Sequence, residues 1–244
     1  MAKKRKSRMF HLNKDRPIKT WNPVVGCKHH CYGDDCWAAI MARRLRHLSQ
    51  YQHGFDCPAL MEEELDKKFR AGDVVFVSSM GDLFGEWVPM EWILRVADAM
   101  RKSPDVTFFL ETKNPIRYFA FLGILPYNVI FSTTIETNKD YRRSKAPPPY
   151  ERYRAMFRLP EQYKKHISIE PIMDFDLDIL VEWMREIKPA LISVGYDNYG
   201  CGLPEPPLDK TMALIKELER FTKVERKNLR RSNKFNWRGD NKKR

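Results

Sequence analysis

Residues 27–36 read CKHHCYGDDC and place three cysteines, Cys27, Cys31 and Cys36, within ten positions. The segment follows a short apolar run that ends at Gly26 and precedes a helical pattern that begins at Trp37. Three soft thiolates on one strand-to-helix loop suit a metal or an iron–sulfur cluster better than a disulfide framework. Three protein ligands also leave one coordination position open, as reactive metal centres do, whereas structural zinc sites usually close all four.

Short β-branched or aromatic runs recur along the chain, and each is followed by a loop and a helical pattern. Runs such as VVFVSS, VTFFLET and ALISVG are almost continuously hydrophobic, which is typical of parallel strands covered on both faces. The expected strands are Trp21–Gly26, Val74–Ser79, Val106–Thr112, Asn128–Thr134, His166–Glu170 and Ala190–Gly195. The expected helices are Trp37–Ser49, Met90–Arg101, Pro115–Leu122, Tyr150–Phe157, Leu177–Ile187 and Asp209–Phe221. Six such units joined by right-handed crossovers predict an α/β fold, a partial (β/α)6 TIM-like barrel with parallel strands.

Polar and ionisable residues follow every predicted strand. Strand by strand they are Cys27; Ser79, Met80, Gly81 and Asp82; Glu111, Thr112 and Lys113; Thr133, Thr134 and Glu136; Glu170 and Pro171; and Asp197 and Asn198. In parallel sheets the reactive residues lie beyond the carboxyl ends of the strands. A buried barrel has little other use for so many ionisable groups on one rim. We therefore expect an active site at this rim, shared with the cysteine loop.

Four stretches of sequence carry a family resemblance. Together with the cysteine triad, these segments resemble the radical S-adenosylmethionine (SAM) superfamily: TWNPVVGC, CWAAIMARRL, VFVSSMGDLFGEWVP and ETKNP. Within it they resemble a phage- and archaea-associated family of radical-SAM-like proteins with TWNPxxGC and SMxDLF motifs. The match runs over most of residues 20–221 in order.

The resemblance implies two cofactors and an enzymatic activity. Cys27, Cys31 and Cys36 would hold three irons of a 4Fe-4S cluster, and the amino and carboxylate groups of SAM would chelate the fourth. One electron passed to SAM would cleave it and form a 5′-deoxyadenosyl radical, which abstracts hydrogen from a substrate. The resemblance leaves that substrate unidentified, and it implies an electron donor of the flavodoxin or ferredoxin type.

The cysteine spacing departs from the pattern CxxxCxxC that is usual in the superfamily. Here three residues separate Cys27 from Cys31, and four separate Cys31 from Cys36, so the second gap holds two extra residues. Gly33 can absorb this insertion in a turn with a positive φ angle, which glycine adopts readily.

The resemblance also implies which rim residues meet SAM. Ser79, Gly81 and Asp82 are expected at its amino group. Lys113, Thr133 and Thr134 are candidates for its carboxylate and ribose hydroxyls, and Glu136 and Glu170 for either SAM or the substrate.

The competing interpretation is a non-catalytic, zinc-stabilised nucleic-acid-binding protein. His29 or His30 would be the fourth zinc ligand, although neighbouring ligands in this segment are cramped, and His53 or Cys57 offers a more distant one. Cys57 is otherwise expected to be an ordinary small residue. Cys201 follows the sixth predicted strand and is a candidate to overhang the site.

The net charge of +12 is unevenly distributed. Residues 1–20 carry eight Lys/Arg and one acidic residue, and residues 222–244 carry ten Lys/Arg and two acidic residues. The intervening residues, 21–221, therefore have a net charge of −3. The sequence therefore predicts a basic tail over 1–19, a folded body over 20–221 and a basic tail over 222–244. Basic tails bind polyanions or keep a protein soluble, so nucleic acid is an expected partner and a nucleotide-derived substrate the first expectation.

Composition also bears on location. No run of ~18 apolar residues is present, and MAKKRKSRMF lacks the apolar stretch of a signal peptide. Five cysteines, three of them clustered, fit a reducing compartment. We therefore expect a cytoplasmic protein that does not bind membranes.

Overall fold

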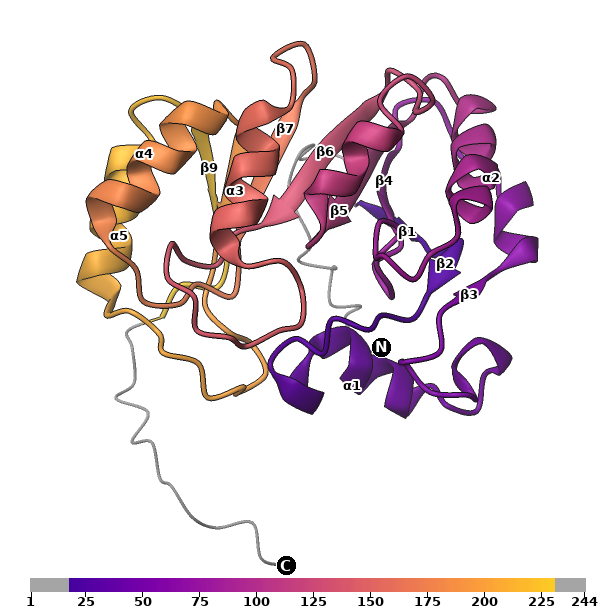
Figure 1. Cartoon of the computed structure of the whole chain (residues 1–244), viewed down its shortest axis with the longest axis horizontal. Helices are drawn as coiled ribbons and strands as arrows, with labels where there is room; N and C mark the ends of the chain where they lie inside the picture. The colour runs from indigo at the N-terminus through magenta and orange to yellow at the C-terminus, as the bar shows by residue number, and fades with distance from the viewer. Residues whose placement is uncertain (1–17, 231–244) are drawn as a thin grey trace, which may run out of the picture.

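The protein, described by a computed structural model over residues 18–230, is built on one parallel sheet (Figure 1). Its seven strands follow the order β1-β4-β5-β6-β7-β8-β9, and every neighbouring pair is parallel. They are β1 (Lys19–Trp21), β4 (Val74–Val77), β5 (Thr107–Thr112), β6 (Val129–Thr134), β7 (Lys165–Ile169), β8 (Leu191–Val194) and β9 (Lys223–Arg226). The sheet does not close, because β1 and β9 remain its two edges. This open parallel arrangement confirms the predicted α/β partial barrel.

One face of the sheet is covered by α2 (Met90–Arg101), α3 (Pro149–Arg158), α4 (Leu177–Ile187) and α5 (Leu208–Leu218). Helix α1 (Trp37–Arg44) packs instead in a separate cluster with Val25 and Met80. The short 3-10 helices are η1 (Gly33–Asp35), η2 (Ser49–Tyr51), η3 (Glu62–Asp66) and η4 (Pro115–Ala120). The main core joins Leu110 and Ile167 of the strands to Ile93, Leu180 and Leu214 of the helices. No helix within residues 18–230 is both long enough and apolar enough to span a membrane.

Alternate strand residues point to the opposite face, which we call the inner face. There Phe109 packs with Ile18, Phe76 and Ile130 in a small separate cluster. Toward the carboxyl ends of the strands the inner face becomes polar, beginning with Glu111 two residues after Phe109. The helices thus seal one side of the sheet, and the other side carries polar side chains near the predicted rim.

The first predicted strand, Trp21–Gly26, is divided in two. Residues Lys19–Trp21 form β1 in the main sheet, whereas β2 (Val24–Val25) pairs antiparallel with β3 (Ala59–Leu60) outside it. Pro23 stands at the break, and proline has no backbone N–H to donate to a ladder. The predicted α-helix over Pro115–Leu122 is a 3-10 helix that ends at Ala120.

The seventh strand lies in a segment that the sequence assigns to the C-terminal tail. Lys223–Arg226 pairs with β8 as β9, so the sheet extends past the predicted boundary at residue 221. The prediction was wrong there because KVER has one apolar residue among charges and lacks the continuous apolar run of the other strands. The remaining parts of the predicted tails, 1–17 and 231–244, lie outside the described residues.

A close backbone approach fixes where the cysteine loop starts. Gly26 forms a parallel bridge with Gly81, and its N–H donates to the carbonyl of Met80 at 2.9 Å. A Cβ atom on Gly81 would lie only 2.9 Å from the Val24 carbonyl oxygen and 3.0 Å from that of Gly26. The chain therefore passes from β2 to Cys27 against the carboxyl end of β4, at a distance that only glycine permits.

Replacing Gly81 with alanine is expected to destabilise the fold by about 1–3 kcal/mol, because the added methyl group overlaps backbone oxygens. Urea unfolding followed by circular dichroism measures this loss. Gly123→Ala is the matched control, since a Cβ there meets no atom within 4 Å. Equal unfolding midpoints for the two variants would contradict the close approach.

Candidate functional site

The cysteine loop lies at the carboxyl end of the sheet, beside the loops that follow β6 and β8 (Figure 1). The N–H of Tyr32 donates to the Arg143 carbonyl at 2.6 Å, and the N–H of Lys145 donates to the His29 carbonyl at 2.6 Å. From the other loop, the Cys201 thiol donates to the Asp35 carbonyl at 3.3 Å. Two loops that are distant in sequence thus flank the cysteine loop, in keeping with the predicted convergence of polar strand ends.

The three thiols of the loop lie within electrostatic range of one another. Burial raises the pKa of Cys27 well above its ordinary value, and Asp82, Cys31 and Cys36 add to this increase. Burial likewise raises the pKa of Cys31, and Cys36 contributes in the same direction. Cys31 is buried, whereas Cys27 and Cys36 are partly exposed, so the group reaches from the interior to an accessible surface.

The thiols do not form the ligand set of a single ion. Within residues 18–230, no group of three or more His, Cys, Asp or Glu side chains is arranged to hold one metal ion. A zinc ion gathers four ligands at about 2.0–2.3 Å, whereas cluster thiolates each bind a different iron and lie farther apart. The choice between an iron–sulfur cluster and the zinc alternative stays a prediction.

A buried hydrogen-bonded pair holds the first half of the cysteine loop. His29, between Cys27 and Cys31, lies with its Nε2 2.8 Å from Asp82 Oδ2, and both side chains are buried. Asp82 also accepts from the N–H groups of Phe84 and Lys113, each at 3.0 Å. Burial alone would raise the pKa of Asp82, but these hydrogen bonds and the neighbouring imidazole hold it below its usual value.

A second buried network, which we call the Glu136 hub, holds the other half of the loop. Tyr32, between Cys31 and Cys36, donates its hydroxyl to Glu136 Oε1 at 2.7 Å. Lys113 of the loop after β5 also donates to Oε1 and to the Tyr32 hydroxyl, and Arg152 of α3 donates to Glu136 Oε2 at 2.8 Å. Burial would raise the pKa of Glu136, but Arg152 and Lys113 lower it far below its ordinary value.

The charges of the Glu136 hub are unbalanced in a way that suits a thiolate. Lys113 and Arg152 contribute two positive charges, and Glu136 contributes one negative charge. Burial would lower the pKa of Lys113, but Cys31 and Glu136 raise it above its usual value. The surplus positive charge therefore lies where a Cys31 thiolate would compensate it. The His29 N–H also points to Cys27 Sγ at 3.5 Å, and such hydrogen bonds stabilise cluster sulfurs.

The long second gap between the cysteines is taken up locally. Gly33 adopts φ of 69°, as predicted, and Tyr32 before it also has a left-handed φ of 59°. The residues that follow form η1 and lead directly to Cys36. The two extra residues thus make one short turn that aims Tyr32 at the Glu136 hub.

The other predicted SAM contacts bind the chain's own groups. Ser79 donates to the Asn22 side chain at 3.1 Å, and Gly81 makes the close backbone approach described above. Thr133 donates to the Thr112 carbonyl at 2.6 Å, and Thr134 donates to Glu111 at 2.8 Å. Glu170 accepts from Asn198 at 3.3 Å, and burial raises its pKa. The roles of all these residues toward SAM remain predictions.

Sequence reasoning missed several buried polar groups at this end of the sheet. Four buried atoms here have no hydrogen-bond partner: Ser78 Oγ, Trp87 Nε1, Asn114 Oδ1 and Arg152 Nε. Ser78, just after β4, also has a left-handed φ of 54°, which is uncommon for a residue with a side chain. Unpartnered buried polar atoms and backbone strain gather at binding sites. Ser78 adjoins the segment expected to meet SAM, so the donor set there fits a polar ligand.

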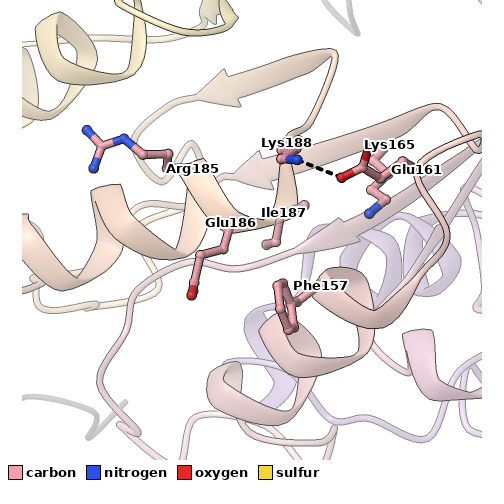
Figure 2. Close-up of a pocket in the computed structure, with 7 residues that line it drawn as sticks. All are labelled: Phe157, Glu161, Lys165, Arg185, Glu186, Ile187 and Lys188. Atoms are coloured by element: carbon pink, nitrogen blue, oxygen red, sulfur yellow. Dashed lines mark hydrogen bonds and ion pairs between the residues drawn. The ribbon is translucent and has the colours of Figure 1, made fainter.

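Two cavities lie away from the cysteines. One of about 330 Å³ lies between α3 and α4, where Lys188 pairs with Glu161 at 2.6 Å beside Lys165 and Phe157 (Figure 2). Lys165 begins β7, so this cavity is at the amino end of the sheet, opposite the cysteine loop. A smaller cavity of about 210 Å³ is lined by Asn114 and Arg152, behind the Glu136 hub.

A family model described as "Protein of unknown function (DUF5131)" matches residues 16–186. No curated protein matches the sequence.

Solved structures of radical SAM enzymes share the fold. A spore photoproduct lyase mutant with bound AdoMet and dinucleoside spore photoproduct aligns with a TM-score of 0.53 and 8% identity, over 83% of this chain and 61% of that one. Another mutant of that lyase aligns with a TM-score of 0.52 and 9% identity, over 91% of this chain and 66% of that one. Streptococcus suis SuiB bound to precursor peptide SuiA aligns with a TM-score of 0.54 and 13% identity, over 87% of this chain and 49% of that one. The chain spans less than two thirds of each, and at these identities the likeness concerns the fold.

Replacing Glu136 with glutamine is expected to destabilise the protein by about 3–5 kcal/mol, because it leaves the Lys113 and Arg152 cations buried together. The folded pKa of Glu136 is lowered, so its contribution is present above the unfolded pKa of about 4.3 and is lost as the pH falls below it. Urea unfolding across pH 3–7 should therefore show a smaller acid loss in the variant. Glu161→Gln, in an exposed pair, should leave the midpoint unchanged, and a similar result for Glu136→Gln would contradict the hub.

Proposed function

The chain belongs to the DUF5131 family, and we propose that it is a radical SAM enzyme that binds a 4Fe-4S cluster through Cys27, Cys31 and Cys36. The observation that carries the proposal is the position of these three thiols. They lie together on one loop at the carboxyl end of a parallel partial barrel, held by buried contacts in each gap between them. The radical SAM enzymes that share the fold support the same proposal.

The chain's own residues prepare the site for a negatively charged group. When bound, the cluster and SAM supply one-electron cleavage of SAM and the 5′-deoxyadenosyl radical. Lys113 keeps a positive charge beside Cys31, and the His29 N–H donates toward Cys27 Sγ. Asp82 and the Glu136 hub restrain the two gaps of the loop through His29 and Tyr32. Ser78 and the segment Ser79–Asp82 are the proposed contacts for the SAM amino group.

The substrate proposal rests on charge and on one relative. Spore photoproduct lyase has been solved with a dinucleoside spore photoproduct, and the sequence ends in basic segments. We therefore propose a nucleic-acid or nucleotide-derived substrate, with a flavodoxin- or ferredoxin-type electron donor. The inner face carries Glu170 and Glu225, whose negative charges repel phosphate, so contacts to a nucleic-acid backbone are expected outside it.

Anaerobic reconstitution tests the cluster. Wild-type protein should become brown, hold about four irons per chain and release 5′-deoxyadenosine from SAM after reduction. Cys36→Ala should lose the cluster, whereas Cys57→Ala should keep its iron content, because Cys57 is exposed and outside the thiol group. A colourless wild type that holds one zinc and leaves SAM intact would support the binding-protein alternative. Equal iron loss in both variants would revise the ligand set.

Truncation tests the nucleic-acid proposal. Removing residues 231–244 deletes basic residues without touching β9, so it should weaken binding to single-stranded DNA or RNA and flatten the salt dependence of that binding. Fluorescence anisotropy at several salt concentrations measures both effects. Unchanged affinity and slope would contradict a role for this segment.

A further inference from the structure

A continuous row of polar side chains crosses the inner face, with one residue from each of five neighbouring strands. Ser132 Oγ lies 3.3 Å from Glu111 Oε2 and 2.7 Å from His166 Nδ1. On the other side of the imidazole, His166 Nε2 lies 3.0 Å from Ser193 Oγ, and Ser193 Oγ lies 3.0 Å from Glu225 Oε2. The three middle side chains are buried, and the two carboxyl groups at the ends are partly exposed.

The row contains more hydrogen bonds than its neutral serines and histidine can supply. Each of the four bonds needs one hydrogen, and a hydroxyl donates only one. Ser132, Ser193 and a neutral His166 provide three hydrogens together. The fourth must come from a protonated Glu111, a protonated Glu225 or a second imidazole N–H. The row therefore holds one additional proton, which its geometry allows at three positions.

The surroundings select among these positions. Burial lowers the pKa of His166 to about 3, and the charge of Lys227 contributes, so the imidazole is neutral. Burial raises the pKa of Glu111, and Glu170 adds to the increase, although Thr134, Ser132 and Lys113 oppose it. Glu111 is thus the favoured carrier of the proton. It then donates to Ser132, Ser132 donates to His166 Nδ1, and His166 carries its hydrogen on Nε2.

We propose that Glu111, Ser132, His166, Ser193 and Glu225 form a proton relay whose substrate end is Glu111. Four linked transfers move a proton along it, from Glu111 to Ser132 Oγ, from Ser132 to His166 Nδ1, from His166 Nε2 to Ser193 Oγ, and from Ser193 to Glu225. Ser132, His166 and Ser193 each gain one hydrogen and lose one, so they stay neutral, and the negative charge moves from Glu225 to Glu111. Glu111 then changes from a carboxylic acid to a carboxylate while the extra proton stays on Glu225.

The position of Glu111 connects the relay to the site. It lies on β5 two residues before Lys113 of the Glu136 hub, and its electrostatic neighbours include Lys113 and Glu170. The far end, Glu225, belongs to the edge strand β9. A substrate bound on the inner face beneath the cysteine loop would meet Glu111 as acid or base. This last step rests on the proposed function, whereas the relay itself does not.

The tautomer of His166 reports the direction of the relay. In [15N]histidine-labelled protein, NMR should show hydrogen on Nε2 in the wild type. Glu111→Gln replaces the donating acid with a donating amide and should keep hydrogen on Nε2. Glu225→Gln places the amide donor at the opposite end, so Ser193 should donate to Nε2 and the hydrogen should move to Nδ1. A His166→Asn sample assigns the signal.

Several outcomes would overturn the proposal. The same tautomer in both glutamine variants would show a static polar cluster, and an imidazolium or an Nδ1 hydrogen in the wild type would remove Glu111 as the resting acid. Adding Ser193→Ala to Glu225→Gln cuts the row and should return the hydrogen to Nε2; a persistent Nδ1 hydrogen also counts against it. Infrared spectra supply a second measurement, since the wild type should show a protonated carboxyl band that disappears in Glu111→Gln. None of these measurements needs SAM cleavage. If cluster assembly failed, the proposed enzymatic function would be contradicted, but the expected tautomers and infrared bands would be unchanged.

Discussion

The buried carboxylate of Glu136 determines where the cysteine loop can lie. It receives hydrogen bonds from the loop through Tyr32, from the end of β5 through Lys113 and from α3 through Arg152. An ionised group in a low-dielectric interior is costly unless all its partners stay in place. The loop, the sheet and the helix are therefore positioned together, and Cys31 is held beside a lysine that favours its thiolate.

Strand β5 joins this hub to the polar row of the inner face. Glu111 and Lys113 are two residues apart, so they lie on the same side of the chain as it leaves the sheet. The charge of Lys113 opposes the effect of burial on Glu111, and Glu111 in turn receives a hydrogen bond from Thr134 of β6. The charge of Lys113 therefore acts on both Glu136 and Glu111, one in the hub and one on the inner face.

Much of the fold follows from the sequence because buried parallel strands are continuous apolar runs. Strands β4 to β8 and helices α2 to α5 lie within a few residues of their predicted bounds. The division of the first apolar run at Pro23 was not predicted because the run reads as one strand, and β9 was not predicted because its sequence KVER lacks an apolar run. At the site, the cysteine loop and the polar rim can be predicted, because their residue types directly follow the predicted strands. The pairs His29–Asp82 and Tyr32–Glu136 are not, because partners more than fifty residues apart are chosen by three-dimensional packing.

The polar row has a further consequence for how the chain finds its native pairing. Successive strand residues face opposite sides, so sliding β7 or β8 by one position would turn His166 or Ser193 into the apolar layer under the helices. Ile167 or Ile192 would then meet carboxylates and hydroxyls instead. A sheet with a shifted register would bury polar side chains without hydrogen bonds and expose apolar ones. The row therefore favours the native register of β7 and β8 over a register shifted by one residue.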